Sequence, residues 1–206
     1  MKKKKFTTYE DYVELQKSKI VDKSHLIRGG PDLEYKKQIK FKRPWVNLVK
    51  KYAPKPTNKI LVLGGRWGSD IRYLREAGFE CEIIAIDLYN PPLISTVQYG
   101  DAHDLSAFKG PFDIVWVYHV FEHFYSPSTV IKQIESVVKR SSILAIVLPS
   151  YTKKDRYDAQ TEFTNEGEFL HLFDNSIIKL EHREVKKKKD IKKMEQPDYW
   201  YIFKVY

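Results

Sequence analysis

Two short apolar segments are each followed by residues that suit ligand binding. Residues 60–63 run into a glycine-rich turn at 64–68, and residues 83–86 are followed directly by Asp87. Glycine permits tight turns with positive φ and lets a ligand approach the backbone closely. An ionised carboxylate offers two acceptor oxygens. Because ligands of open α/β sheets bind outside the carboxyl ends of the strands, we expect the turn and Asp87 to line one crevice.

Residues that could move a proton follow a third apolar segment, residues 112–117. Tyr118 and His119 come at its end, and Glu122 and His123 follow one turn later. Histidine titrates near neutrality and can take a proton from a hydroxyl or an amine. Either imidazole could instead serve packing or bond a helix end. No third ligand with suitable spacing accompanies Glu122 and His123, so we predict no metal site.

The pattern around the glycine turn is typical of a β-α-β unit. Apolar residues at helical spacing predict a helix from residue 69, capped by Ser69 or Asp70 and ended by Gly78. Further along, the patterns predict strands at 95–99, 112–117 and 143–148, a helix that opens at 126–128 and extends to Val138, and a helix at 165–173.

The N-terminal part of the chain is expected to be an added helical layer. Residues 1–56 are predicted to form an extension that packs on the core, with a first helix near residues 8–19. A second helix would be capped by Asp32 and kinked at Pro44.

The remainder, residues 57–206, is predicted to be a single core domain. It ends in two strands, 177–185 and 199–206, which suggest an antiparallel pair at the end of the sheet. The polar stretch 151–164 is long for a connection in a compact domain, so we expect a lid or an acceptor-binding loop there. Tyr151, Arg156 and Tyr157 could contact the acceptor.

The composition favours a globular chain in a reducing compartment. Of 206 residues, 42% are hydrophobic and 14% aromatic, and Cys81 is the single cysteine. No apolar run approaches a membrane span and no signal peptide is evident, so we expect a cytoplasmic protein without a membrane partner. The formal charge of +9 comes mostly from lysine runs at 2–5 and 186–193. Such runs are usually solvated, although a nucleic-acid partner would also suit them.

Four motifs in order resemble the class I S-adenosylmethionine-dependent methyltransferases. They are LGGRWGSDI after the first strand, IDL after the second, GDAHDL at 100–105, and HVFEHFYSP at 119–127. The first is similar to a branch that reads LGAR-x-G-T-E-V. The commoner first motif is acidic-x-G-x-G-x-G, so Val62 stands in place of the acid and Arg66 in place of the middle glycine. The resemblance implies a single-domain, Rossmann-like α/β methyltransferase fold. Its sheet is mostly parallel and twisted, with helices on both faces and an antiparallel C-terminal strand pair.

The resemblance also implies roles for residues at the matching positions. Asp87 would bond the ribose hydroxyls of S-adenosylmethionine, and Asp101 would accept a hydrogen bond from the adenine amine. Arg66 either crowds the methionine end or binds its carboxylate, for which a guanidinium is well shaped. The cofactor-binding set predicted in this way is Gly64, Gly65, Arg66, Gly68, Asp87, Leu88, Asp101, Ala102 and Tyr118; the candidate catalytic residues are His119, Glu122 and His123.

The resulting hypothesis is transfer of a methyl group from S-adenosylmethionine to an oxygen or nitrogen atom of a small-molecule or sugar acceptor. Two alternatives stay open. The lysine runs would suit an RNA methyltransferase. The departures from the common motif at Val62 and Arg66 would suit a non-catalytic regulatory or partner protein with the same fold. A nicotinamide-dependent oxidoreductase is disfavoured because the G-x-G-x-x-G pattern is absent. The sequence leaves the oligomeric state open.

Overall fold

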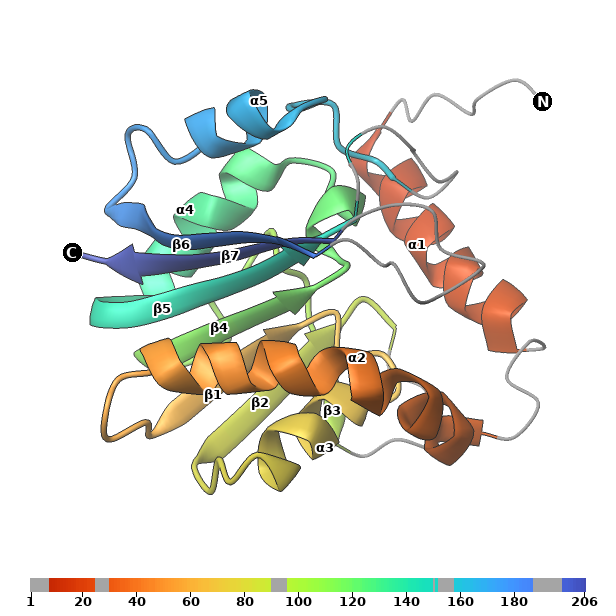
Figure 1. Ribbon diagram of the computed structural model, residues 1–206. Helices are drawn as coiled ribbons and strands as arrows, with labels where there is room; N and C mark the ends of the chain where they lie inside the picture. Colours follow the sequence, from red (N-terminus) through yellow and green to blue (C-terminus); the bar gives the residue numbers. More distant parts are fainter. Residues whose placement is uncertain (1–7, 25–29, 90–95, 150, 152–157, 187–197) are drawn as a thin grey trace.

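The chain folds around one seven-stranded sheet, shown in Figure 1. The computed structural model describes residues 8–24, 30–89, 96–149, 151, 158–186 and 198–206. The strand order is β3-β2-β1-β4-β5-β7-β6; β7 runs antiparallel to β5 and β6, and the other pairs are parallel. The strands are β1 Lys59–Leu63, β2 Glu82–Asp87, β3 Val97–Tyr99, β4 Phe112–Tyr118, β5 Val138–Leu148, β6 Ile178–Lys186 and β7 Asp198–Val205. The predicted α/β class and the antiparallel C-terminal pair are confirmed.

Helices cover both faces of this sheet (Figure 1). Helices α2 and α3 pack on one face, where Trp45, Val49 and Leu74 join a cluster of buried sheet residues. Helices α4 and α5 pack on the other, where Ile131 and Phe169 belong to a second cluster. The helices are α1 Tyr9–Ser24, α2 Gly30–Tyr52, α3 Ser69–Glu76, α4 Pro127–Val137 and α5 Glu166–His171, with a 3-10 turn η1 at Phe121–His123. The central strands read as unbroken apolar runs because both of their faces are buried.

Helix α1 has a different place from the other helices. Figure 1 shows it across the end of the sheet toward which β4 points, not on either face. Ligand sites in open α/β sheets form at this end. None of the described helices has the length and apolar character needed to cross a membrane.

Several predicted boundaries are corrected by the structure. Helix α1 extends to Ser24, well past residue 19. Helix α2 begins at Gly30, so Asp32 lies inside its first turn and is not its cap, and Pro44 lies within one continuous helix. Val138, predicted to end a helix, begins β5, because it pairs with Phe112 across the sheet. The following Lys-Arg-Ser-Ser sequence is polar, so no apolar pattern marked this part of the strand.

Some of the predicted features lie outside the described residues. These are Arg156 and Tyr157 of the expected acceptor loop, and the lysine runs at 2–5 and 187–193. Tyr151, the third residue of that loop, is described: its hydroxyl lies 2.6 Å from the hydroxyl of Tyr201 on β7.

Candidate active site

The glycine turn connects β1 to α3 and is held against the end of β2. The backbone N–H groups of Gly64 and Gly65 both donate to the carbonyl of Ile86, each at 2.9 Å. Gly64 has φ of 73°, and a side chain there would collide with Val120. A glycine is therefore required at residue 64 by the protein's own packing as well as by any ligand.

Arg66 occupies the position where the commoner motif has its middle glycine. Its φ of 39° lies in the left-handed region that glycine favours, so the turn keeps a glycine-like backbone with an arginine side chain. Gly68, with φ of 72°, is the N-cap residue of α3.

The prediction that Ser69 or Asp70 caps α3 is wrong. No side chain caps this helix, and Asp70 is instead paired with Lys42 of α2, with 2.6 Å between Oδ1 and Nζ. The ammonium of Lys42 also lies over the ring of Tyr118, 4.2 Å from its centroid. Because Gly68 is the N-cap, Asp70 lies inside the first turn of α3, and its buried carboxylate is satisfied by the ammonium of Lys42.

Asp87 lies at the end of β2, where the sequence predicted it. The backbone N–H of Arg66 donates to its Oδ2 at 3.0 Å, and the N–H of Tyr89 donates to its Oδ1 at 3.3 Å. These two bonds set the orientation of the carboxylate relative to the glycine turn.

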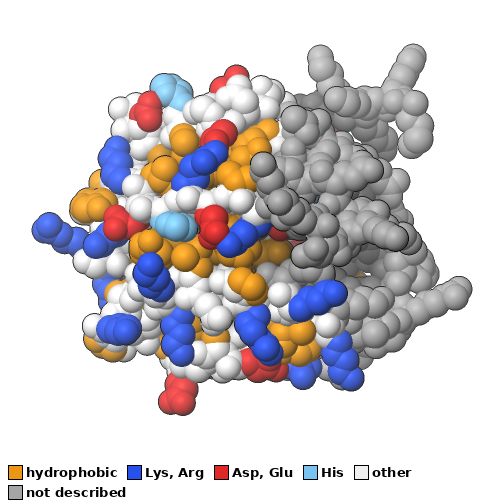
Figure 2. Space-filling model, viewed as in Figure 1, with side chains coloured by type: hydrophobic (Ala, Val, Ile, Leu, Met, Phe, Trp, Pro, Cys, Tyr) orange, Lys and Arg blue, Asp and Glu red, His pale blue; other side chains and the backbone are white. Residues whose placement is uncertain are grey.

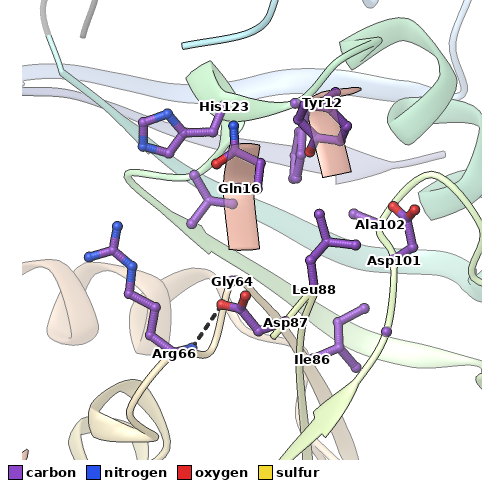
Figure 3. Close-up of a pocket in the computed structure, with 13 residues that line it drawn as sticks. Tyr12, Gln16, Gly64, Arg66, Ile86, Asp87, Leu88, Asp101, Ala102 and His123 are labelled. Atoms are coloured by element: carbon purple, nitrogen blue, oxygen red, sulfur yellow. Dashed lines mark hydrogen bonds between the residues drawn. The ribbon is translucent and has the colours of Figure 1, made fainter. Parts of the chain in front are cut away.

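A cavity of about 70 Å³ lies between the glycine turn, Asp87 and helix α1. Figure 3 shows Arg66 and His123 at one end, Asp101 and Ala102 at the other, and Asp87 between them. The structure brings seven predicted residues together in its lining: Gly64, Arg66, Asp87, Leu88, Asp101, Ala102 and His123. Five predicted residues do not line it: Gly65, Gly68, Tyr118, His119 and Glu122.

Six further lining residues were not predicted: Tyr12, Gln16, Ile86, Gly100, Val120 and Phe124. Four of them lie inside or next to motifs that the sequence had singled out. Tyr12 and Gln16 belong to α1 and have i, i+4 spacing, which places both on one face of a helix. This spacing could have indicated that both side chains face the cavity. Aromatic residues at helical spacing more often belong to the core, so nothing in the sequence favoured a binding role.

The two candidate histidines each lie beside a carboxylate from a distant part of the chain. His123 Nδ1 is 2.9 Å from Oδ1 of Asp158, and its Nε2 is 3.8 Å from Oε1 of Glu122. His119 Nε2 is 3.2 Å from Oδ1 of Asp198. The ring of His119 stacks on Tyr118 with 4.5 Å between centroids. Of the two imidazoles, His123 is the one that faces the cavity.

Asp101 is an ionised group at the other end of the cavity. Burial opposes its ionisation, but hydrogen bonds from His103 and Tyr9 outweigh that cost and hold its pKa below the ordinary value. Among the described residues, no cluster of three His, Cys, Asp or Glu side chains is arranged to hold a metal ion.

The fold and this cavity agree with what comparison with known proteins shows. A family model described as a methyltransferase domain matches residues 35–187, which is most of the chain. The protein therefore belongs to the methyltransferase-domain family. Its cofactor is S-adenosylmethionine, and the chemistry of the family is S-adenosylmethionine-dependent methyl transfer. No curated protein matches the sequence.

Solved structures share the fold at low sequence identity. A SAM-dependent methyltransferase from Aquifex aeolicus superposes with a TM-score of 0.57 and 15% identity, covering 84% of this chain and 97% of that one. One from Mesorhizobium loti gives 0.59 and 13%, covering 77% and 96%. The cyclase SpnF gives 0.63 and 14%, covering 79% and 80%. Since one of these neighbours is named as a cyclase, the fold by itself does not establish the reaction.

The polar groups of the cavity fit this cofactor in kind. Asp87 and Asp101 are acceptors, as hydroxyl and amine donors require, and the guanidinium of Arg66 is a donor suited to a carboxylate. Asp87 is already oriented by two backbone N–H groups. The volume of about 70 Å³ is small for a nucleoside, and Tyr12 and Gln16 of α1 are among the residues that line it.

Proposed function

We propose that this protein transfers a methyl group from S-adenosylmethionine to an oxygen or nitrogen atom of a small-molecule or sugar acceptor. The observation that carries the proposal is that His123, flanked by Asp158, lines the same cavity as Asp87. A carboxylate-flanked imidazole beside a nucleoside-type site is suited to an acceptor that must lose a proton.

In this proposal the cavity residues hold the cofactor along the carboxyl ends of β1 and β2. Asp87 accepts the ribose hydroxyls, with Leu88 beside it, and Asp101 and the backbone of Ala102 meet the adenine. Arg66 binds the carboxylate of the methionine part. Gly64, Gly65 and Gly68 give the turn its shape, as their packing and φ values support.

His123 is the proposed general base and Asp158 its positioning residue. Bound S-adenosylmethionine supplies an electrophilic methyl group on its sulfonium. The protein must then hold the acceptor atom in line with that group at roughly 3 Å and exclude water. A carboxylate on each side of His123, Asp158 and Glu122, stabilises the imidazolium that forms when His123 takes the acceptor proton.

His119 and Tyr118 have another role in this proposal. Their rings stack on each other, the ring of Tyr118 lies beside the buried Lys42, and His119 Nε2 is 3.2 Å from Oδ1 of Asp198. They form a rigid wall that orients the turn carrying His123. His119 adopts φ of 53°, and its packing and its contact with Asp198 hold it in this strained conformation.

A small acceptor is favoured over RNA by the charge on the face of the described residues that Figure 2 shows. On the face shown in Figure 2, Lys and Arg side chains are interspersed with acidic and hydrophobic ones and do not form a continuous basic strip. Proteins that bind nucleic acid along a groove instead have Lys and Arg side chains clustered along that groove.

The test is formation of S-adenosylhomocysteine from S-adenosylmethionine in the presence of acceptors. The whole protein is incubated with a panel of small hydroxyl- and amine-bearing compounds, including sugars, and separately with transfer RNA. We expect turnover with a small acceptor that is insensitive to salt between 50 and 200 mM, since phosphate contacts make RNA binding steeply salt-dependent.

Two outcomes would contradict the proposal. Salt-sensitive turnover with RNA alone would make the protein an RNA methyltransferase. Tight binding of S-adenosylhomocysteine without turnover on any acceptor would favour a non-catalytic protein. The variant Asp87→Asn serves in both assays as the reference with weakened cofactor binding.

A further inference from the structure

Helix α1 forms one wall of the cavity through residues to which the proposed function assigns no role. Tyr12 and Gln16 line it from above, opposite Asp87 and Leu88 (Figure 3). Only 2% of Tyr12 is exposed. Its ring lies 5.5 Å from that of His103, centroid to centroid, so α1 packs directly on the loop that follows β3.

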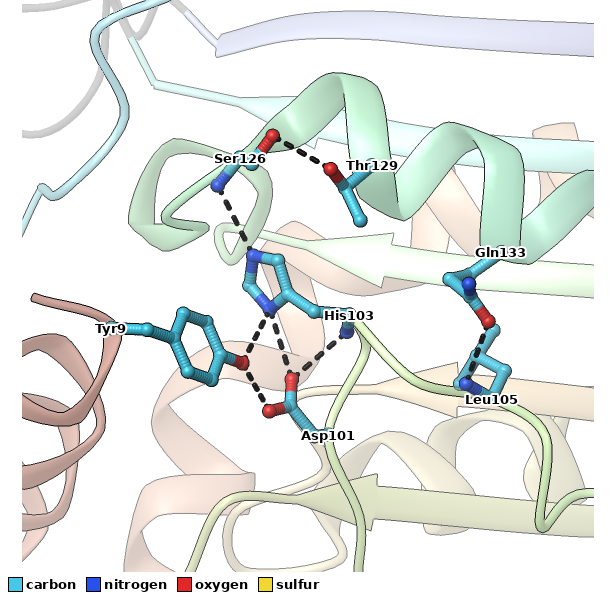
Figure 4. A network of polar contacts seen from close by, with 7 residues as sticks. All are labelled: Tyr9, Asp101, His103, Leu105, Ser126, Thr129 and Gln133. Carbon is cyan, nitrogen blue, oxygen red and sulfur yellow. Dashed lines mark hydrogen bonds and ion pairs between the residues drawn. The ribbon is translucent and has the colours of Figure 1, made fainter.

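The hydroxyl of Tyr9, also on α1, donates a hydrogen bond to Oδ2 of Asp101. Figure 4 shows Tyr9 reaching from α1 to Asp101 and His103. Burial and the neighbouring carboxylate raise the pKa of Tyr9, so the phenol stays protonated and remains a donor. This is a charge-assisted bond, a stronger kind than a bond between neutral groups.

The other oxygen of Asp101 is taken by His103. The backbone N–H and Nδ1 of His103 both lie 2.9 Å from Oδ1. The N–H of Ser126, at the start of α4, donates to Nε2 of His103 at 3.1 Å. Nε2 is therefore an acceptor, so Nδ1 carries the ring proton and donates it to Asp101. Oδ2 is the oxygen that remains for Tyr9.

The size of the cavity agrees with the position of α1 beside Asp101. A cavity of roughly 150 Å³ takes up one benzene ring, whereas the space here is about 70 Å³. A purine is larger than benzene, and Tyr12 and Gln16 of α1 line this space, so we expect α1 to shift when a purine binds beside Asp101.

We propose that Tyr9 is an internal competitor for the cofactor. Its hydroxyl holds the oxygen of Asp101 that the exocyclic amine of adenine takes, so binding exchanges one hydrogen bond for the other and displaces the first turn of α1. The proposal rests on the cofactor site described above and is independent of the acceptor class. Tyr9 thereby lowers cofactor affinity and couples α1 to cofactor binding.

Calorimetric titration with S-adenosylhomocysteine tests the exchange. The variant Tyr9→Phe keeps the ring and loses the hydroxyl, so it should bind about tenfold more tightly, the effect of about one charge-assisted hydrogen bond. Combined with Asp101→Ala, the same substitution should change nothing, because the contested oxygen is gone. The control is Tyr125→Phe, since the ring of Tyr125 touches that of Tyr9.

Equal or weaker binding by Tyr9→Phe would overturn the competition. Tightening that persists in the Asp101→Ala background would also overturn it, since the effect would then come from loosening α1. Absence of binding by all the proteins, wild type included, would reject the cofactor site itself and the competition with it.

A measurement on the wild-type protein guards against a folding defect in the variants. With carbon-13 in the tyrosine rings, the Tyr9 signal is identified by its loss in Tyr9→Phe. Added S-adenosylhomocysteine should shift the Tyr9 signal away from its carboxylate-bonded position and leave Tyr125 in place. A Tyr9 signal that stays in place in the bound protein would overturn the proposal.

Discussion

Lys42 and Asp70 form an ion pair, with 2.6 Å between Nζ and Oδ1, that joins the middle of α2 to the first turn of α3. Only 5% of Lys42 and 7% of Asp70 are exposed. Asp70 follows the glycine turn, and the Nζ of Lys42 lies over the ring of Tyr118. It therefore ties the N-terminal helices to the elements that carry the cavity.

Breaking this pair should cost much of the protein's stability. Lys42→Met leaves the Asp70 carboxylate buried without its cation, and we expect a loss of about 3 to 5 kcal/mol in the free energy of unfolding. Urea denaturation measures it. The double variant Lys42→Met, Asp70→Leu should recover most of the loss because no unpaired charge remains. A single variant as stable as the wild type would show that the pair is not needed.

The proposed ribose contact predicts a loss of cofactor affinity in Asp87→Asn. The change removes the charge and one acceptor oxygen, so we expect S-adenosylhomocysteine to bind about 10- to 100-fold more weakly by calorimetry. Glu82→Gln is the matched control, because Glu82 begins the same strand at its opposite end. Undiminished affinity in Asp87→Asn would remove this residue from the site.

The proposed base predicts a loss of turnover in His123→Gln. We expect about a 100-fold lower rate at saturating cofactor once an acceptor is known. The positioning variant Asp158→Asn should lose less and should shift the acidic limb of the pH–rate profile to lower pH, since the imidazolium loses a neighbouring charge. His171→Gln, in an exposed helix end, is the control, its side chain being 80% exposed. A pH–rate profile that is the same in Asp158→Asn and in the wild type would exclude a positioning role for Asp158.

Asp113 predicts how stability depends on pH. Burial opposes its ionisation, but Lys139 and the backbone N–H groups of Asn58 and Lys59 outweigh this and hold its pKa below the ordinary 3.8. Its folded-state pKa is depressed, so its contribution is complete above about pH 4 and is lost as the pH falls through the lowered value.

The variant Asp113→Asn tests this dependence. It should be less stable by about 2 kcal/mol at pH 7, because Lys139 and the backbone N–H groups of Asn58 and Lys59 lose a charged acceptor. Its urea midpoint should also fall less than that of the wild type between pH 5 and pH 2. Parallel curves for the two proteins would show that another carboxylate carries the acid dependence.

Much of the fold could be predicted because its signals are local. The apolar runs of β1 and β4 mark strands buried on both faces, and that of β2 marks a partly buried strand. The glycine turn with Asp87 marks the place where a ligand site forms. Helix caps were harder to predict. Asp70 is of a type that often caps helices, yet Gly68 is the N-cap of α3, and Asp70 pairs with Lys42, which is 28 positions away.

The succession of strands and helices along the chain follows from residue type and spacing. The cofactor class and the predicted half of the cavity follow from the resemblance of four motifs to class I S-adenosylmethionine-dependent methyltransferases. The remaining half depends on contacts between segments far apart in sequence. Tyr9 meets Asp101 across 92 positions, and Asp158 and Asp198 reach the histidines after β4 from segments beyond β5. Which side chains complete a site depends on how helices and loops pack at the end of the sheet, and this packing has no signature in local spacing.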